Sequence, residues 1–513
     1  MKIKETLIRN AFSNWLAYAI QIAVVFYTSP KLVHTLGEDR YGVWSLVEGV
    51  IGYFAILDFG LSSTVVRFVA KYHAQNEWQR LNRLISASVL ILGVCSLIVV
   101  VGACSIAFGF EDPFHLNDSE AANNARWLLV ICGLNLAVTF ATQAYGGILI
   151  GMSKFPTYNG LKTFGVLGWA VAVVVMLDRG YGLVELVAVK ACIDCFAQVL
   201  MVWRAKRLLP QCRLDFTDIN RETIDDVRSF SGSAFLIMMA GAAASHSDAV
   251  FIAYFLGLRY VTYYMIAKRL AEYSRSFFQR LYTVLTPVFS SLDAKNENDK
   301  ICGILLTATR YMLYLAVPLQ AGLIYLGKPF ITLWMDANLA AFSYPVLVIL
   351  CMPLAFRVTQ SVASKVLYGT GRLKWLTVVA IAQSVLNVVV SIVLIPHYGI
   401  IGCALGTTLP SIAASLVMCG YTCRRYSISP FTYVGATLLK PCIPLPAMLA
   451  VWYGVSRYYP VNSWLAFLIV GASGTVVYAL VAAIIEFGLY DAFRKLQARF
   501  VPLARKPEFD ANS

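Results

Sequence analysis

The feature that most constrains this chain is a series of apolar runs, each about twenty residues long, that recurs from one end of the sequence to the other. An α-helix of that length spans a hydrocarbon core of about 30 Å. Only 14% of the residues are charged and 59% are hydrophobic, whereas a soluble domain carries about 25% charge. The sequence therefore predicts an all-α integral membrane protein.

Apolar windows bounded by charged residues, Gly, Pro and Asn predict about fourteen transmembrane helices. The predicted spans are residues 11–31, 42–66, 84–108, 126–150, 161–178, 183–203, 231–256, 260–289, 303–327, 340–368, 375–396, 400–423, 432–455 and 464–487. The first of them follows a basic N-terminus but has no small-x-small cleavage motif, so we predict a retained span and not a signal peptide.

The Lys and Arg residues are distributed unevenly between the loops. With the N-terminus in the cytoplasm, about 27 of the 42 cations fall in inner loops and about seven in outer loops. This asymmetry follows the positive-inside rule and predicts a multi-pass protein with both termini in the cytoplasm. Because these cations lie between spans, the net charge of +14 does not indicate a nucleic-acid partner.

The two halves of the chain resemble each other when one is shifted by about 218 residues. Three pairs of segments match in the same order, namely 36–41 with 256–260, 151–154 with 369–372, and 181–184 with 398–401. Because each half has six predicted spans, an even number, we expect a parallel repeat about a pseudo-two-fold axis along the membrane normal. The predicted parts are an N-terminal six-helix lobe (1–210), a cytoplasmic basic linker (211–230), a C-terminal six-helix lobe (231–425), two extra transmembrane helices (426–490) and a cytoplasmic basic tail (491–513).

The eighth predicted span carries the densest set of ionisable residues. Lys268, Glu272 and Arg275 fall at i, i+4 and i+7, on one face of a helix, and Arg269 lies beside them. Glu272 can neutralise only part of this charge, and lipid cannot satisfy the rest. We therefore expect this face to line a solvated cavity or to meet anions.

A cationic cavity of this kind predicts a phosphate-bearing substrate. Guanidinium groups suit phosphate and pyrophosphate because their donors form a planar fork and stay charged, and neutral polar and aromatic groups suit sugars. The predicted substrate-binding residues are Lys268, Arg269, Arg275, Arg310, Arg357 and Gln143. The alternative for any one cation is an internal ion pair or a side chain that snorkels to an interface.

Carboxylates at membrane depth are candidates for coupling or gating, because a buried carboxylate can load and release a proton or Na⁺. The candidates are Asp58, Glu272 and Asp248. Asp194 lies four residues after Lys190, so we predict a structural pair there. No His and Cys cluster predicts a metal site, and no Gly-x4-Gly-Lys-[Ser/Thr] motif predicts direct use of ATP. A coupling proton or Na⁺ is thus the only cofactor considered.

Several short patterns resemble the oligosaccharide and polysaccharide flippases, the Wzx-type branch of the multidrug/oligosaccharidyl-lipid/polysaccharide (MATE/MOP) exporter superfamily. The resemblance covers nearly the whole chain. The patterns are Leu36-Gly37 with Arg40-Tyr-Gly42, Leu57-Asp-Phe-Gly-Leu61 before Val65-Val-Arg-Phe-Val69, Asp248 before Leu256-Gly257 with Tyr263-Tyr264 beyond, and Tyr398-Gly-Ile-Ile-Gly402.

The resemblance implies a protein of the bacterial cytoplasmic (inner) membrane that turns an undecaprenyl-pyrophosphate-linked oligosaccharide from the cytoplasmic to the outer leaflet, for assembly of O-antigen, capsule or exopolysaccharide. Its partners would be this lipid-linked oligosaccharide, membrane lipids, and a polysaccharide polymerase with its chain-length machinery. Three alternatives stay open. They are a cation-coupled drug exporter on the same scaffold, a membrane enzyme such as a glycan polymerase or acyltransferase, and a scaffold protein.

Overall fold

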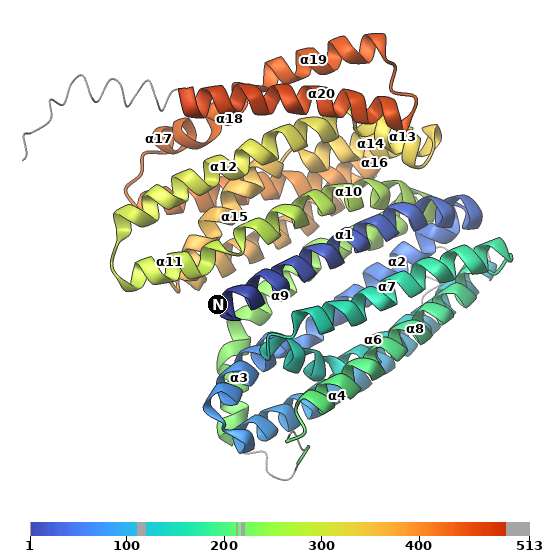
Figure 1. The fold of residues 1–513 in the computed structure, drawn as a ribbon. Helices are drawn as coiled ribbons and strands as arrows, with labels where there is room; N and C mark the ends of the chain where they lie inside the picture. Colours follow the sequence, from blue (N-terminus) through green and yellow to red (C-terminus); the bar gives the residue numbers. More distant parts are fainter. Residues whose placement is uncertain (1, 110–118, 212–213, 217–220, 489–513) are drawn as a thin grey trace, which may run out of the picture. The chain divides into compact units, whose positions relative to one another are not determined.

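The computed structural model describes residues 2–109, 119–211, 214–216 and 221–488, and every regular element in these ranges is a helix. Parts of the predicted outer loop (109–125) and of the predicted linker (211–230), and the whole predicted tail (491–513), lie outside the described residues. The chain is an all-α membrane protein, as the apolar runs predicted (Figure 1).

In the described residues of the first half of the chain, the structure has seven helices and a 3₁₀ turn. They are α1 (Lys2–Leu36), α2 (Glu38–Phe54) with a 3₁₀ turn (Ala55–Asp58), α3 (Leu61–Gln75), α4 (Trp78–Phe108), α6 (Ser119–Gly151), α7 (Phe155–Asp178) and α8 (Leu183–Leu208). Lys and Arg occupy the C-terminal turn of α8, where cations complement the negative end of the helix dipole.

The second half repeats this order and then continues into a C-terminal hairpin. Its helices are α9 (Arg221–Leu256), α10 (Leu258–Tyr282), α11 (Leu285–Ala294), α12 (Asn298–Tyr325), α13 (Gly327–Trp334), α14 (Ala337–Cys351), α15 (Leu354–Gly369) and α16 (Leu373–Arg425). The C-terminal part comprises α17 (Pro430–Val434), a π-helical segment (Gly435–Leu439), α18 (Lys440–Cys442), α19 (Leu445–Tyr458), α20 (Trp464–Ala483) and a second π-helical segment (Ile484–Gly488).

Equivalent junctions of the two halves share their backbone geometry. Gly37 and Gly257 have φ values of 86° and 100°, and each lies between the first two helices of its half. Ser153 and Gly371, at 58° and 71°, occupy the second matched junction. The parallel repeat that the sequence predicted therefore extends to the backbone conformation of its turns.

A further repeated junction was missed in the sequence. Asn76 and Asn296 adopt left-handed conformations with φ values of 58° and 56°, and each is followed by a Glu that precedes a long helix. Glu77 pairs with Arg80 three residues later, and Glu297 pairs with Lys300 at the same spacing. Asn tolerates this region better than most residues, so the Asn-Glu dipeptide was the available signal.

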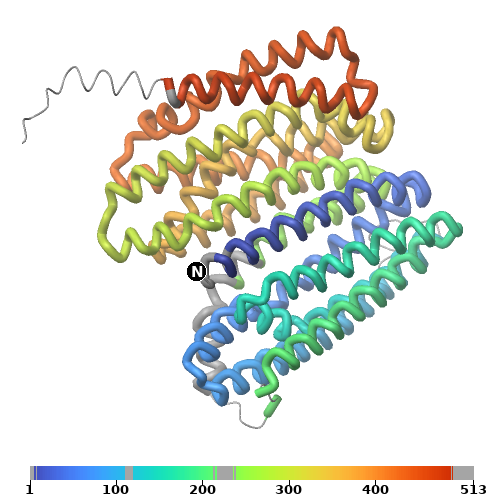
Figure 2. The backbone as a smooth tube through the Cα atoms, in the orientation of Figure 1, coloured from blue at the N-terminus to red at the C-terminus, as the bar shows by residue number. Residues whose placement is uncertain are grey.

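Left-handed residues break the predicted span 42–66 and also mark the junction between two later predicted spans. Between α2 and α3 the chain bends by 41° at Phe59 and Gly60, whose φ values are 48° and 75°, and this break can be followed in Figure 2. Within α16 the residue Gly399 has φ 59° and ψ −140°, which separates two helices. Only glycine occupies that region without strain, and the break falls between predicted spans 375–396 and 400–423.

The number of spans is consistent with the prediction. Ten helical runs in the described ranges are long and apolar enough to cross a membrane, and the bent pair α2–α3 raises the number to eleven. The run Leu373–Arg425 is counted as one of these helices, although Gly399 divides it into two. The more polar helices α9 and α10–α11 lie over predicted spans 231–256 and 260–289.

The chain forms two compact units. Unit 1 comprises residues 1–273, 341–350 and 373–414, and unit 2 comprises residues 274–340, 351–372 and 415–513. Unit 1 thus combines the first half of the chain with α9, the N-terminal part of α10, most of α14 and most of α16. The helices of the second half are thus divided between the two units.

Each unit has its own apolar core. In unit 1 the helices α3, α4, α6 and α8 bury side chains such as Val65, Leu84 and Ile148. In unit 2 the ring of Trp452 on α19 is 2% exposed and stacks on Tyr325 of α12, with 5.6 Å between ring centroids. This tryptophan fixes the C-terminal hairpin to the second half of the chain.

Helix α2 approaches the start of α10 at a glycine. A Cβ atom on Gly42 would lie 2.2 Å from the carbonyl oxygen of Leu258. That atom belongs to the backbone, so no side-chain rotation relieves the clash. The close approach of these two helices therefore requires glycine at position 42.

We expect Gly42→Ala to lower the free energy of unfolding by about 1–3 kcal/mol, because the two backbones must separate. Thermal unfolding of the purified protein in detergent measures this effect. Gly93→Ala is the matched control, since a Cβ there meets nothing within 4 Å. Equal loss of stability in both variants would contradict the close-approach argument.

Candidate functional site

Lys268 on α10 forms a buried ion pair with Asp248 of α9. Its Nζ lies 2.9 Å from Asp248 Oδ2, and the two side chains are 10% and 1% exposed. The ammonium also donates to the Ser245 carbonyl, the Tyr264 hydroxyl donates to Oδ2 at 2.8 Å, and the Cys403 thiol to Oδ1 at 3.5 Å. The predicted substrate contact Lys268 and the predicted coupling candidate Asp248 thus neutralise each other.

Arg269 is paired with a carboxylate from the first half of the chain. Its Nη2 lies 3.3 Å from Glu48 Oε2 on α2, and its guanidinium carbon lies 5.6 Å from the ring centroid of Tyr41. Sequence reasoning considered only Glu272 as a partner for this stripe of cations. It missed Glu48 because the two residues are 221 positions apart.

A second network joins the N-terminal ends of α2 and α10. Glu38 accepts hydrogen bonds from Arg259 Nε and, at 2.7 Å, from the Tyr263 hydroxyl. The Glu38 carbonyl accepts from Thr262 Oγ1 at 2.6 Å. Pairs 38–259 and 48–269 have the same separation of 221 residues. The two helices therefore run parallel and in register, and they are the equivalent helices of the repeat.

The remaining charged residues of the stripe are accessible. Glu272 and Arg275 are exposed, and neither takes part in a salt bridge with another residue in the part of the chain that the structure describes. The charged side chains Lys268 and Arg269 of α10 are thus paired, whereas Glu272 and Arg275, nearer its C-terminus, are accessible. Of the predicted substrate-binding cations on this helix, Arg275 is the one that the surrounding helices leave available.

Two further predicted cations lie in unit 2. Arg310 on α12 is 2.7 Å from Glu486 Oε1 in the last π-helical segment, and the Tyr314 hydroxyl donates to the same carboxylate at 3.3 Å. Arg310 therefore faces the C-terminal hairpin, which sequence reasoning had not connected with it. Arg357 lies half-buried on α15.

Gln143 and Asp58, which were predicted to have different roles, both form hydrogen bonds with Ser62. Asp58 ends the 3₁₀ turn at the break of the second span and is 7% exposed. Its Oδ1 accepts from the Ser62 backbone N at 3.3 Å and from Ser62 Oγ at 2.8 Å. The Gln143 Nε2 donates to the same Ser62 Oγ. The structure thus gathers residues from α6, α3 and the break itself.

The predicted pair in α8 is confirmed. Lys190 Nζ lies 2.6 Å from Asp194 Oδ2, and Asn135 of α6 donates to the same oxygen at 3.2 Å. His246 packs against the break-proximal part of α2, with its ring centroid 6.0 Å from that of Tyr53.

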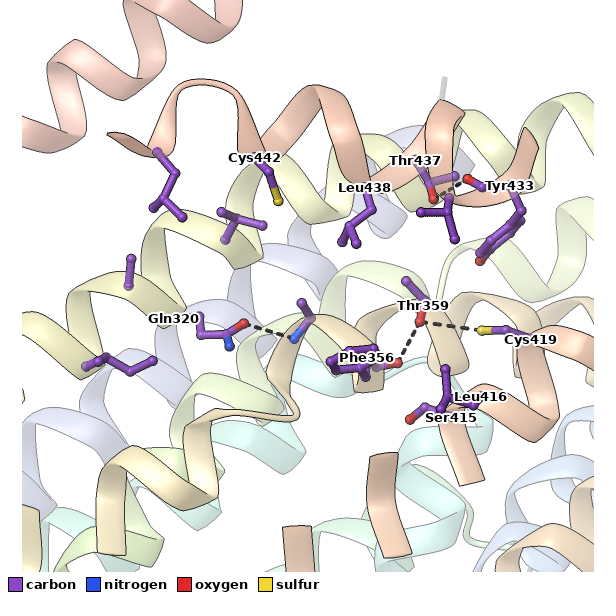
Figure 3. A pocket seen from close by; sticks show the side chains of 16 residues that line it. Gln320, Phe356, Thr359, Ser415, Leu416, Cys419, Tyr433, Thr437, Leu438 and Cys442 are labelled. Carbon is purple, nitrogen blue, oxygen red and sulfur yellow. Dashed lines mark hydrogen bonds between the residues drawn. The ribbon is translucent and has the colours of Figure 1, made fainter. Parts of the chain in front are cut away.

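An apolar cavity of about 340 Å³ lies within unit 2. Figure 3 shows Phe356, Leu416 and Leu438 turned toward this space. Polar groups of the wall bond to the wall itself, since Thr359 donates to the Phe356 carbonyl at 2.7 Å and Gln320 accepts from a backbone N–H at 3.2 Å. The volume falls within the range of about 300–1,000 Å³ typical of ligand pockets. The lining comes from α12, α15, the C-terminal part of α16 and residues 433–445.

Comparison of the sequence with known protein families identifies the family of this chain. The family model described as "Polysaccharide biosynthesis protein" matches residues 7–293, more than half of the chain. The chain belongs to this polysaccharide biosynthesis protein family. The match includes α2 and α10, and with them the Glu38 and Glu48 networks.

Relatives of this family member are similar over most of their length. The probable low-salt glycan biosynthesis flippase Agl15 of Haloferax volcanii is 22% identical, over 97% of this chain and 100% of its own. A putative O-antigen transporter of Shigella flexneri is 21% identical, over 80% of this chain and 97% of its own.

Solved structures share the fold of this polysaccharide biosynthesis protein. The lipid II flippase MurJ in an inward closed conformation has a TM-score of 0.72 at 17% identity, covering 94% of this chain and all of its own. An inward-facing multidrug resistance MATE family transporter of the MOP superfamily has a TM-score of 0.68 at 14% identity, covering 80% and 98%.

We expect Lys268→Met to destabilise the protein by about 3–5 kcal/mol, because it leaves the Asp248 carboxylate buried without a cation. The double variant Lys268→Met with Asp248→Leu should recover most of this loss, since a buried pair replaced by apolar groups is often neutral. Thermal unfolding in detergent measures both. Lys31→Met is the control, because its partner Asp178 is 62% exposed and such surface pairs contribute about 0–1 kcal/mol. A double variant no more stable than Lys268→Met would contradict the pairing.

Proposed function

We propose that this protein is a flippase that moves a lipid-linked oligosaccharide across the bacterial cytoplasmic membrane during surface polysaccharide biosynthesis. The observation that carries the proposal is the family match over residues 7–293. Similarity to proteins named as a glycan flippase, over 97% of this chain, and as an O-antigen transporter, over 80% of it, supports the proposal. The substrate is translocated without covalent change.

The finer proposal is an undecaprenyl-pyrophosphate carrier, moved from the cytoplasmic to the outer leaflet. A pyrophosphate needs charge-assisted donors, and Arg275 offers an exposed guanidinium on α10. An isoprenoid chain needs an apolar surface, and the cavity of unit 2 offers about 340 Å³ lined mainly by apolar side chains. On the outer side the glycan would pass to a polymerase and its chain-length machinery.

We propose that translocation proceeds by alternating exposure, with both termini in the cytoplasm. In that orientation the N-terminal ends of α2 and α10 lie on the outer side. The pair Glu38–Arg259 joins the two halves there, and the pair Glu48–Arg269 joins them ten residues further along both helices. Release to the outer leaflet therefore requires these pairs to separate. They form an outer gate.

Reconstitution tests the function directly. The purified protein is placed in liposomes with a fluorescent undecaprenyl-pyrophosphate oligosaccharide in the inner leaflet, and arrival in the outer leaflet is followed by a membrane-impermeant quencher. Protein-dependent transfer supports a flippase. Transfer no faster than in protein-free liposomes, or a chemically altered glycan, would contradict it.

We expect Arg275→Gln to reduce flipping about tenfold or more, since a hydrogen bond to a charged group contributes about 1.5–3 kcal/mol. Surface polysaccharide in cells and transfer in liposomes both measure this loss, with membrane abundance unchanged. Arg80→Gln is the matched control, because Arg80 is an exposed cation near a helix start and pairs locally with Glu77. Normal transfer by Arg275→Gln would remove this residue from the substrate path.

The outer gate predicts that cross-linking α2 to α10 stops transport. Glu48→Cys with Arg269→Cys, in a background without the twelve native cysteines, is joined by a short cleavable bis-maleimide. Transfer should stop and return after cleavage. The control is Arg40→Cys with Glu120→Cys, because this exposed pair lies within the first half of the chain. Transport that continues through a fully cross-linked 48–269 pair would contradict the gate.

A further inference from the structure

The C-terminal end of α8 carries three cations without a carboxylate partner among the described residues. Arg204, Lys206 and Arg207 are exposed, and none of them takes part in a salt bridge within the described ranges. Exposed cations elsewhere, such as Arg80 and Lys300, pair with a carboxylate three residues away. The negative end of the helix dipole is equivalent to about half an elementary charge, so it offsets only part of this positive charge.

Aromatic rings hold these cations at the surface of the helix. The guanidinium carbons of Arg204 and Arg207 lie 5.0 and 5.4 Å from the ring centroid of Trp203, and the Lys206 Nζ lies 5.9 Å from that of Tyr145 on α6. Trp203 is itself exposed. Because its ring is apolar and its N–H is polar, an exposed tryptophan is typical of the interface between membrane and water. The cations therefore lie at the level of the lipid headgroups.

An apolar stripe along α8 leads to these cations. Phe196, Val199 and Trp203 fall at i, i+3 and i+7 and are exposed. Arg207 follows at i+11, on the same face of the helix. Helix α7 lies beside α8 (Figure 1), and its Phe164 packs against Phe196 with ring centroids 5.9 Å apart. Exposed apolar surface of this kind marks contact with lipid, and a stripe that ends in cations matches the two parts of a phospholipid.

The chain that follows α8 is held on another helix. Asn82 of α4 donates to the Gln211 carbonyl at 3.0 Å, and the Asp215 backbone N–H donates to Ser86 Oγ of α4 at 2.9 Å. The described part of this chain is therefore fixed to α4, and the cations of α8 stay exposed. In the proposed orientation this end of α8 is cytoplasmic, where anionic lipids give the membrane surface a negative potential.

We propose that the C-terminal end of α8 binds an anionic phospholipid of the cytoplasmic leaflet. Its phosphate lies at Arg204, Lys206 and Arg207, since guanidinium groups suit phosphate oxygens, and its acyl chains lie along Phe196 and Val199. These residues are separate from those assigned to the substrate path. The inference goes beyond the proposed flippase function and uses the proposed orientation only to name the leaflet.

Thermal unfolding of the purified full-length protein in an uncharged detergent tests this site, because a ligand that binds the folded state raises the unfolding temperature. The probes are dihexanoyl phosphatidylglycerol, dihexanoyl phosphatidylcholine and inorganic pyrophosphate. Phosphatidylglycerol should bind at least about tenfold more tightly than phosphatidylcholine, because its headgroup is anionic. Raising the salt from about 0.1 M to about 1 M should remove this preference, since the Debye length falls from about 10 Å to about 3 Å. Pyrophosphate should bind more weakly than phosphatidylglycerol, because it has no acyl chain.

The triple variant Arg204→Gln, Lys206→Gln and Arg207→Gln should lose the preference for phosphatidylglycerol while unfolding at the wild-type temperature without lipid. Lys300→Gln is the matched control, because this exposed lysine pairs with Glu297, and it should keep the preference.

Equal binding of the two phospholipids by the wild type, or a preference that the triple variant retains, would overturn the lipid site. Pyrophosphate that raises the unfolding temperature as much as phosphatidylglycerol would also overturn it, because the site would then bind a free anion. The salt series needs no variant, so a preference that persists at high salt would contradict the role of the cations even where the triple variant does not fold.

Discussion

Charge neutralisation within a medium of low polarity is the constraint on which the rest of this structure depends. A hydrocarbon core offers no water to stabilise an ionised side chain, so each such group needs a partner, a wet surface or loss of its charge. The spans show all three solutions. Lys268 is paired with the Asp248 carboxylate, and Arg275 is exposed. Among the described residues, the hydrogen bonds to Asp58 come from the neutral groups of Ser62. Whether a charged residue has a structural role or is available to a substrate therefore depends more on its position relative to its partners than on the sign of its charge.

This constraint also explains which parts were predictable from sequence. Apolar length and turn residues are local properties, so the spans, the parallel repeat and the break at Gly399 followed from short stretches of chain. The Lys190–Asp194 pair was predictable for the same reason, since one helical turn brings the residues together.

The partners of the predicted cations were not predictable in this way. Glu48 meets Arg269 across 221 residues, and Glu486 meets Arg310 from the far end of the chain. Helix periodicity places residues on a face, but it does not say which other helix covers that face. The expected surplus of positive charge on α10 was therefore too large, because carboxylates on α2 and α9 neutralise its N-terminal part. The connection between Gln143 and Asp58 was not predictable for the same reason, since it runs through Ser62 and joins different helices.

The in-register contact of α2 with α10 has a consequence for how the two halves can associate. In the two ion pairs of this contact the first half contributes the acids, Glu38 and Glu48, and the second contributes the guanidinium groups, Arg259 and Arg269. Two copies of either half, brought together by the same symmetry, would oppose like charges along this seam. The charges of this seam thus make each half complementary to the other, and they disfavour an assembly of two identical halves.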